Sequence, residues 1–424
     1  MLRFAPSPTG DMHIGNLRLA IFNYLLSQQN DEALIVRIED MDTERNIEGK
    51  DQEILDILGL FGIEYKEVIY QSSHLKYHRA MALQLLHDKK AFSCFCTPET
   101  IESKKKAAKV AKKAYRYDGT CENLPADLVI DNMNPFVIRL KKPNSSLHVS
   151  DIIEGDNSFI IMRQDKNPTD NFACAIDDMI SNIATVIRSE DHISDTPKQI
   201  AIHHALGYTK DIHYAHIPII LNNEGEKMSK QDSVSSVKWM LEEGFLPSAI
   251  SNYLIVATTK APHEIFTIQE ALEWFDLSDI SASPTRFDID KLRFINQEHL
   301  KMLDDKELSR YVGFADIDIG KMAKIYLNEA STLKELRAKI EPIFAPKKIP
   351  EIFAEQTETI RNIIQMAPHF EEFNEFKAYL VKESGLEEEA LLKPLHLLLT
   401  GTEHGPEVSN LYAYLKNYLG EIIK

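Results

Sequence analysis

The hydrophobic pattern at the start of the chain predicts a strand, a helix and a second strand in close succession. Residues 2–4 are a short apolar run that ends at the proline-rich segment 6–10. From Leu17 onwards, apolar residues recur at the helical offsets 0, 3, 4, 7 and 8, which defines one face of an amphipathic helix. Residues 33–38 are again strand-like. This order predicts an α/β sheet that begins with a right-handed crossover.

The pattern then changes twice along the chain. Residues 75–168 carry strand-like runs at 136–140 and 159–163 and predict an insertion with its own fold. The α/β pattern returns over 177–202, with a strand at 185–188 and a helix that starts near Pro197. Beyond about residue 235 the pattern is helical. Helix breaks are predicted at six prolines: Pro247, Pro262, Pro284, Pro342, Pro346 and Pro350.

Composition narrows the class of protein. Among 424 residues, 27% are charged and 44% hydrophobic, which is typical of a globular chain. We find no apolar stretch long enough to span a membrane and no secretory signal, and we expect a cytoplasmic protein without membrane contact. Four cysteines are too few for a disulfide scaffold, so reduced thiols or metal ligands are expected. The net charge of -17 argues against nonspecific coating of nucleic acid but permits a local basic face.

Two glycines and a histidine follow the first predicted strand. Gly10 and Gly15 let the backbone approach a ligand closely, and His13 lies where the helix begins. Exposed N–H groups and the positive end of the helix dipole favour an anion there. Alone, the segment is more typical of an ordinary strand-to-helix turn.

A second charged segment, Lys227-Met228-Ser229-Lys230, lies about 210 residues further along, after the apolar run 217–221. Two lysines and a hydroxyl in a loop suit a triphosphate, because charge builds up on the phosphoryl oxygens during transfer. Alone, the segment is a solvated charge cluster. Together, the two segments favour a nucleotide site built from distant parts of the chain.

Three cysteines and a lysine-rich run lie in the predicted insertion. Cys94, Cys96 and Cys121 suit a tetrahedral Zn²⁺ with one further ligand, although three reduced structural thiols are an equal alternative. Residues 97–121 hold seven basic and three acidic side chains, which gives a net charge of +4. Such a run is either a solvated helix or a surface that binds RNA phosphates, and the local contrast favours RNA.

These segments resemble the two signatures of class I aminoacyl-tRNA synthetases, and their context resembles the bacterial glutamyl-tRNA synthetase family. The matching segments are Arg3–Gly10, Arg37–Asp40, Arg116–Gly119, Ile187–His192, Thr196–Gln199, Tyr214–His216 and Leu399–Gly401. They extend over essentially the whole chain. The resemblance implies that the protein activates L-glutamate with ATP and Mg²⁺ and transfers it to the 3′ end of tRNA.

The resemblance also implies roles for single residues. The implied catalytic residues are His13, Lys227 and Lys230, and the implied ATP-binding residues are Thr9, Gly10, His13, Gly15, Asn16, Lys227, Met228, Ser229 and Lys230. The implied glutamate-binding residues are Arg3, Ser7, Glu39, Asp170 and Arg188. Two guanidinium groups and one acid suit a dicarboxylate with one ammonium group. We therefore expect Arg3, Glu39, Arg188 and Lys230 to line one cleft.

For the insertion, the resemblance implies a metal and an RNA contact. Members of the family that bind zinc use the same Cys-x-Cys, Tyr-x-x-x-Cys arrangement. A structural Zn²⁺ is thus implied on Cys94, Cys96, Tyr117 and Cys121. Contact with the acceptor end of tRNA is implied for five lysines: Lys104, Lys105, Lys109, Lys112 and Lys113.

The resemblance divides the predicted fold into four domains. A Rossmann-like α/β catalytic domain (1–74 and 169–215) is interrupted by an acceptor-binding, zinc-bearing domain (75–168). A stem-contact domain with the Lys227–Lys230 loop (216–305) and a helical anticodon-binding domain (306–424) make the C-terminal half mostly α-helical. The implied partners are tRNA, L-glutamate and ATP, and we expect a monomer.

Three residues depart from the family pattern. Asp170 replaces a tyrosine, Ser189 a glycine, and Gln231 an arginine after Lys230. A carboxylate at position 170 would repel glutamate unless it is protonated, turned away or paired with an arginine. Two alternatives therefore stay open: a paralogue that attaches glutamate to the glutamine tRNA for later amidation, and a catalytically impaired tRNA-binding paralogue. A short relative that glutamylates a modified tRNA base is disfavoured by the length of the chain.

Overall fold

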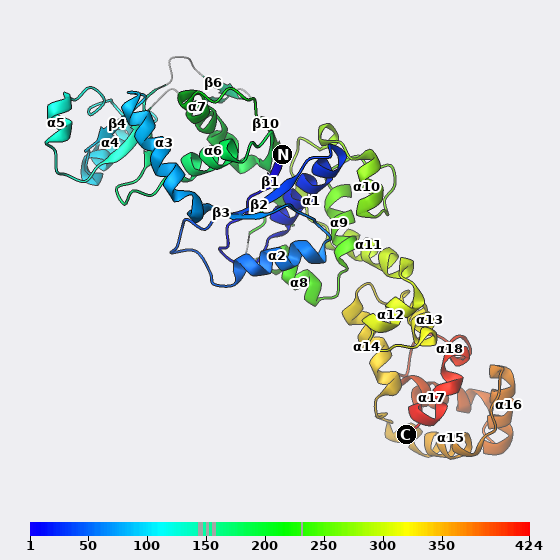
Figure 1. The fold of residues 1–424 in the computed structure, drawn as a ribbon. Coiled ribbons are helices and arrows are strands. Elements are labelled where there is room, and N and C mark those ends of the chain that lie inside the picture. The colour runs from blue at the N-terminus through cyan, green and yellow to red at the C-terminus, as the bar shows by residue number, and fades with distance from the viewer. Residues whose placement is uncertain (143–146, 150–151, 155–157, 230–231) are drawn as a thin grey trace. The chain divides into compact units, whose positions relative to one another are not determined.

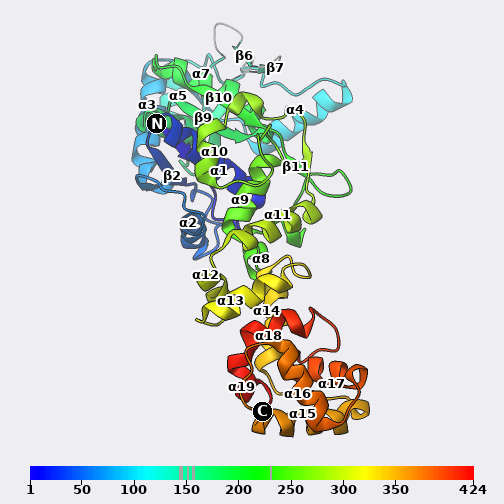
Figure 2. The same ribbon diagram turned by 90° about the vertical axis from the view of Figure 1, so that its right-hand side faces the viewer.

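The structure, a computed structural model, describes all residues except 143–146, 150–151, 155–157 and 230–231 (Figures 1 and 2). The chain forms two compact units. The first consists of Met1–Ser236, Ala257–Ala261 and Ile268–Phe287, and the second of Val237–Val256, Pro262–Thr267 and Asp288–Lys424. The boundaries of the four domains named above stay a prediction.

A five-stranded parallel sheet forms the centre of the first unit, in the order β10-β9-β1-β2-β3. Its strands are β1 (Leu2–Phe4), β2 (Leu34–Ile38), β3 (Val68–Tyr70), β9 (Thr185–Ser189) and β10 (His213–Ile217). Leu2 pairs with Leu34 of β2 and with Thr185 of β9, so the strand order reverses beside β1. In α/β sheets, ligands bind at such a point, beside the carboxyl ends of the strands. The predicted α/β fold and its strands are confirmed.

Six helices accompany this sheet in the first unit: α1 (Ile14–Gln29), α2 (Lys50–Leu60), α3 (Leu75–His87), α6 (Asp170–Ile180), α7 (Thr196–Leu206) and α10 (Ile268–Trp274). Helix α1 packs directly against β1, β2 and β9. Helix α1 begins before Leu17 because the His13 ring caps it and accepts a hydrogen bond from the Gly15 N–H at 3.0 Å. The expectation of a single apolar face on α1 is wrong. The helix packs against both the sheet and α10, so Arg18 and Asn23 are buried as well.

The insertion contains an antiparallel sheet, β4-β5-β8, whose last two strands correspond to the predicted strand-like runs 136–140 and 159–163. Its elements are β4 (Ala91–Cys94), α4 (Pro98–Val110), α5 (Ala126–Ile130), β5 (Val137–Leu140), the paired strands β6 (Leu147–Val149) and β7 (Ile152–Glu154), and β8 (Phe159–Met162). Ile138 and Ile161 pack in one hydrophobic cluster with Leu85 of α3 and Phe172 of α6. The insertion thus shares its core with helices of the main sheet, which fixes it to them.

Two short parallel strands, β11 (Ile220–Leu221) and β12 (Thr285–Arg286), complete the first unit. The second unit is built from helices: α8 (Val237–Glu242), α9 (Pro247–Val256), α11 (Ile289–Met302), α12 (Asp305–Tyr311), α13 (Ile317–Tyr326), α14 (Leu333–Phe344), α15 (Ala354–Met366), α16 (Phe373–Ser384), α17 (Glu388–Thr400), α18 (Val408–Leu415) and α19 (Leu419–Ile422). The mostly helical C-terminal half is confirmed.

One predicted break is wrong, because Pro342 lies inside α14. The proline falls near the end of this helix, where Ile340 and Ile343 are fully buried. Their burial outweighs the loss of one backbone hydrogen bond. Over the described part of the chain, no helix combines the length and apolar character that crossing a bilayer requires.

Candidate functional site

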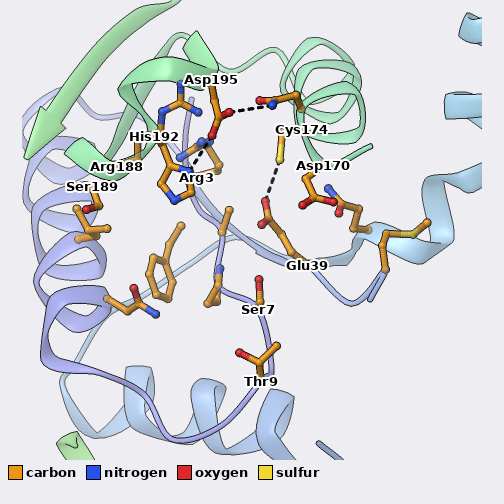
Figure 3. Close-up of a pocket in the computed structure, with 18 of the residues that line it drawn as sticks. Arg3, Ser7, Thr9, Glu39, Asp170, Cys174, Arg188, Ser189, His192 and Asp195 are labelled. Carbon is orange, nitrogen blue, oxygen red and sulfur yellow. Dashed lines mark hydrogen bonds and ion pairs between the residues drawn. The ribbon is translucent and has the colours of Figure 1, made fainter. Parts of the chain in front are cut away.

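A cavity of about 480 Å³ opens at the carboxyl ends of β1, β2 and β9 (Figure 3). All five predicted glutamate-binding residues line it: Arg3, Ser7, Glu39, Asp170 and Arg188. They come from β1 and its following loop, the end of β2, the start of α6, and β9. Adjacent parallel strands therefore bring together residues that lie up to 185 positions apart in the sequence.

Arg3 belongs to a buried ion-pair network below the cavity. Its Nε donates to Asp178 Oδ1 at 3.3 Å, and Arg37 Nη1 donates to the same oxygen at 2.5 Å. Burial works against ionisation of Asp178, but the positive charges of Arg37 and Arg3 outweigh it and hold the pKa of this carboxyl below its usual value. One carboxylate thus compensates two guanidinium groups.

Glu39 is held by two side chains at one of its oxygens. Its Oε1 accepts a hydrogen bond from Cys174 Sγ at 3.2 Å and lies 3.5 Å from Arg37 Nη2. Burial and the charge of Glu39 raise the pKa of the Cys174 thiol well above its usual value, so the thiol remains a donor. The Glu39 carboxylate is therefore held in place at the cavity, and Figure 3 shows its hydrogen bond to Cys174.

Arg188 is 8% exposed and is framed by polar but uncharged groups. Its Nη1 donates to Gln199 Oε1 at 3.0 Å, its Nη2 to the Thr196 hydroxyl, and its Nε to His216 Nε2 at 3.4 Å. The guanidinium also lies 5.3 Å from the centre of the Tyr214 ring. Burial and the nearby charge of Arg3 lower the pKa of Arg188. An anion that entered the cavity would compensate the buried positive charge of Arg188.

Asp170, the first residue of α6, lies at the rim of the cavity. Its side chain is 81% exposed and pairs with Arg163 Nη2 at 3.2 Å. The expected repulsion of glutamate is therefore reduced by pairing with an arginine, one of the three possibilities that the sequence left open. Ser189, the second departure from the family pattern, donates through its hydroxyl to Asp191 Oδ2 at 3.1 Å. Gln231 lies outside the described residues.

A second cavity of about 350 Å³ lies against the start of α1 and the loop after β11. It shares Asn16, Leu19, Ser189 and His192 with the first cavity, so the two are adjacent. Six residues of the predicted ATP-binding set line it: His13, Gly15, Asn16, Lys227, Met228 and Ser229. Thr9 lines the first cavity, and the catalytic assignment of Lys230 falls outside the described residues.

Steric constraints explain why positions 10 and 15 of the first motif are glycines. Gly10 has φ of +142°, a value that residues with a side chain rarely adopt. A Cβ on Gly15 would lie 3.2 Å from Nδ1 of the capping His13 ring. Lys227 Nζ forms an ion pair with Asp191, and both residues line the second cavity together with His13. The second charged segment therefore lies near the start of α1, as the sequence suggested.

The three cysteines of the insertion meet around Tyr117. Their sulfur atoms lie within 4.8 Å of one another, and all four cysteines of the chain are free thiols. Cys96 Sγ lies 3.7 Å from Cys121 Sγ and 3.6 Å from Tyr117 Oη, and Cys94 Sγ lies 3.3 Å from that oxygen. Two sulfurs bound to one tetrahedral Zn²⁺ at about 2.3 Å lie about 3.8 Å apart, so the thiols and the phenol fit zinc.

The lysine-rich helix α4 has no buried residue among those described. It is fixed by its Thr97 cap and by Lys104, whose Nζ pairs with Asp118 at 2.7 Å and donates to Thr120 at 2.9 Å. Lys104 thus ties α4 to the loop that carries Cys121. The four other predicted RNA-binding lysines are exposed: Lys105, Lys109, Lys112 and Lys113.

Several residues at or below the cavity carried no assigned role in the sequence. They are Asp178, Gln199 and Cys174. Gln199 and His216 lie within segments that match the family, and this match could have indicated a role for them. Asp178 follows Asp177, and two adjacent acids within an apolar stretch of a helix are an unusual signal of buried charge.

Comparisons with known proteins place the chain among similar sequences and folds. Residues 1–294 match the family model described as "tRNA synthetases class I (E and Q), catalytic domain". Glutamate--tRNA ligase 2 of Sulfurimonas denitrificans is 62% identical over 432 residues, and Glutamate--tRNA ligase 1 of Nitratiruptor sp. is 54% identical, each alignment covering 100% of both chains. A crystal structure of a glutamate tRNA ligase from Elizabethkingia meningosepticum, in complex with its amino acid, matches with a TM-score of 0.81 at 25% identity and covers 100% of this chain and 99% of that one.

Proposed function

The chain belongs to the class I tRNA synthetase family of the glutamate and glutamine (E and Q) enzymes, and from this premise we propose how its two cavities act. The protein is a glutamate–tRNA ligase, as its full-length relatives are named. Enzymes of this class use ATP and Mg²⁺. The observation that carries our proposal is the adjacency of two cavities: the first has Arg3, Glu39 and Arg188 in its lining, and the second lies at a helix N-terminus.

In the first cavity, the charges match those of glutamate. Arg188, which has no carboxylate within ion-pair distance among the described residues, binds a substrate carboxylate, and Glu39 binds the ammonium group. Arg3 contributes further positive charge to the cavity, although Asp178 neutralises part of it. Ser7 and Asp170 lie at the same cavity and complete the proposed set.

The second cavity holds ATP beside the bound amino acid. An oxygen of the α-carboxylate attacks the α-phosphorus, the bond to the β,γ-phosphates breaks, and pyrophosphate leaves with the electron pair. Such a step needs positioning and charge stabilisation more than covalent help. His13, Lys227 and Ser229 line the nucleotide side, and Lys230, assigned from the sequence, neutralises the charge on departing pyrophosphate. The 3′ end of tRNA then takes the glutamyl group from the adenylate.

Charging assays on separate purified tRNAs test this function. We expect glutamylation of the glutamate tRNA or the glutamine tRNA and pyrophosphate exchange that requires glutamate and tRNA. Lys230→Ala should abolish the exchange. Charging of the glutamine tRNA alone would identify the paralogue that feeds an amidation step. Tight tRNA binding without any exchange would instead support the catalytically impaired paralogue and contradict our proposal.

Zinc on Cys94, Cys96, Cys121 and Tyr117 is the metal that we propose for the insertion. It would hold β4 to the loop 117–121 and act structurally, because the cluster lies outside both cavities. We predict about one equivalent of zinc by metal analysis of protein purified without added metal. Cys96→Ser should lose most of it, whereas the matched control Cys174→Ser should retain it. Well-folded protein with almost no metal would refute the site.

The exposed lysines of α4 and its C-terminal extension should contact tRNA phosphates. We predict that joint replacement of Lys109, Lys112 and Lys113 by alanine raises the KM for tRNA roughly tenfold. It should also make the dependence of log KM on log salt concentration shallower by about 2, because each lost phosphate contact removes roughly 0.7–0.9 from the slope. Steady-state charging at several salt concentrations measures both. Lys66→Ala, an exposed lysine on the loop before β3, is the control and should leave the slope unchanged.

A further inference from the structure

The three buried arginines near the first cavity differ in the charge of their partners. Arg3 and Arg37 share the carboxylate of Asp178. Arg188 is equally buried, yet the residues that the structure describes place no carboxylate within ion-pair distance of it, and its bonds go to Gln199, Thr196 and His216. A buried cation without a counter-ion attracts an anionic ligand more strongly than a cation that is already paired.

All three partners of Arg188 remain neutral. Gln199 and Thr196 carry no ionisable group. Burial and the charge of Arg188 lower the pKa of His216 to about 4, so the imidazole is uncharged at neutral pH. The frame therefore fixes the direction of the guanidinium without reducing its charge.

The orientation of the Gln199 amide is itself determined by a chain of hydrogen bonds. Gln199 Nε2 donates to Asn171 Oδ1 at 3.1 Å, and Asn171 Nδ2 donates to Asp195 Oδ1 at 2.9 Å. Because the nitrogen of Gln199 is engaged by Asn171, its oxygen faces Arg188. The carboxylate at the end of the chain, Asp195, is thus separated from Arg188 by two amides; Figure 3 shows Asp195 and Arg188 at the same side of the cavity.

We propose that Gln199 is a positioning residue whose lack of charge preserves the preference for glutamate over glutamine. It holds the Arg188 guanidinium toward the cavity through an acceptor without charge, so the substrate has to supply the compensating carboxylate. Glutamine would leave a buried cation without a counter-ion, which is a strong basis for rejection. This inference rests on the proposed function, in that Arg188 is taken to bind the side-chain carboxylate of glutamate, which glutamine lacks.

Two substitutions separate charge from shape at this position. Gln199→Glu places a carboxylate about where the amide oxygen is, and it should compensate Arg188 internally. We expect the dissociation constant and the KM for glutamate to rise a hundredfold or more, with a smaller change in kcat and little change in affinity for glutamine. Gln199→Met, similar in size but uncharged, should change glutamate affinity less than tenfold and keep the preference for glutamate.

The measurements are isothermal titration with each amino acid and charging kinetics, with thermal unfolding as a check of folding. Since the new carboxylate would face Asn171 Oδ1, Gln199→Glu is also made together with Asn171→Ala, and compared with Asn171→Ala alone. Equal losses for Gln199→Glu and Gln199→Met, or unchanged preference in Gln199→Glu, would overturn the inference. A wild-type protein that binds glutamate selectively but charges neither tRNA would refute the proposed function and leave this inference standing.

Discussion

Arg188→Gln should lower kcat/KM for glutamate by roughly 10²- to 10³-fold. Removing one partner of a buried, hydrogen-bonded charge pair costs about 3–4 kcal/mol, and each 1.4 kcal/mol corresponds to about tenfold. Arg188 qualifies because it is 8% exposed and its charge is uncompensated before substrate binds. The loss should fall mainly on the KM for glutamate, measured by charging at saturating ATP and tRNA.

Arg163→Gln is the matched control for this prediction. Arg163 also lies near the cavity, but its pair with Asp170 is exposed, with side-chain exposures of 50% and 81%. Exposed pairs contribute little, so we expect less than a tenfold change in the KM for glutamate. Similar KM values for Arg188→Gln and the wild type would contradict the role that we assign to Arg188. If Arg188→Gln also lowered the thermal stability, that loss would not by itself explain a selective rise in the KM for glutamate.

The order of strands and helices could be predicted from the sequence because it depends on local pattern. The apolar runs 2–4, 33–38 and 185–188 correspond to β1, β2 and β9 within a residue or two. Local pattern failed at α1 and at Pro342. In both cases tertiary burial decided the result: two faces of α1 are covered, and the end of α14 is held by buried isoleucines.

The candidate site was predictable only where its residues carry a distinctive chemistry. Arg3, Glu39 and Arg188 were assigned from the family resemblance, in agreement with the charges of a dicarboxylate, and they do line one cavity. Asp178 was not chosen, since its partner Arg37 is 141 residues away in the sequence and nothing local links them. Gln199 carries no charge, so its chemistry gives no signal of catalysis or binding, although it lies in a segment that matches the family. Its role follows from the contact with Arg188, which only the folded chain reveals.

Asp178→Asn should lower the free energy of unfolding by about 3–5 kcal/mol at neutral pH. The substitution leaves Arg3 and the fully buried Arg37 without their shared carboxylate, and breaking a buried ion pair from one side carries a cost of this size. Chemical denaturation followed by circular dichroism measures it. Asp177→Asn is the neighbouring control: Asp177 is also buried, but it accepts from His74, His78 and Gln71, so its loss should cost less.

The pH dependence of the stability difference between Asp178→Asn and the wild type gives an independent check. Because the pKa of Asp178 is lower in the folded protein than in the unfolded chain, the ionised carboxylate adds stability above the unfolded pKa of about 4. That contribution is lost as pH falls from the unfolded value through the folded pKa. Asp178→Asn lacks the titrating group, so its stability deficit relative to the wild type should be largest at pH 6–7 and should shrink below about pH 4. A deficit that stays constant from pH 7 to pH 3 would mean that Asp178 acts through shape alone and that its charge does not hold the two arginines in place.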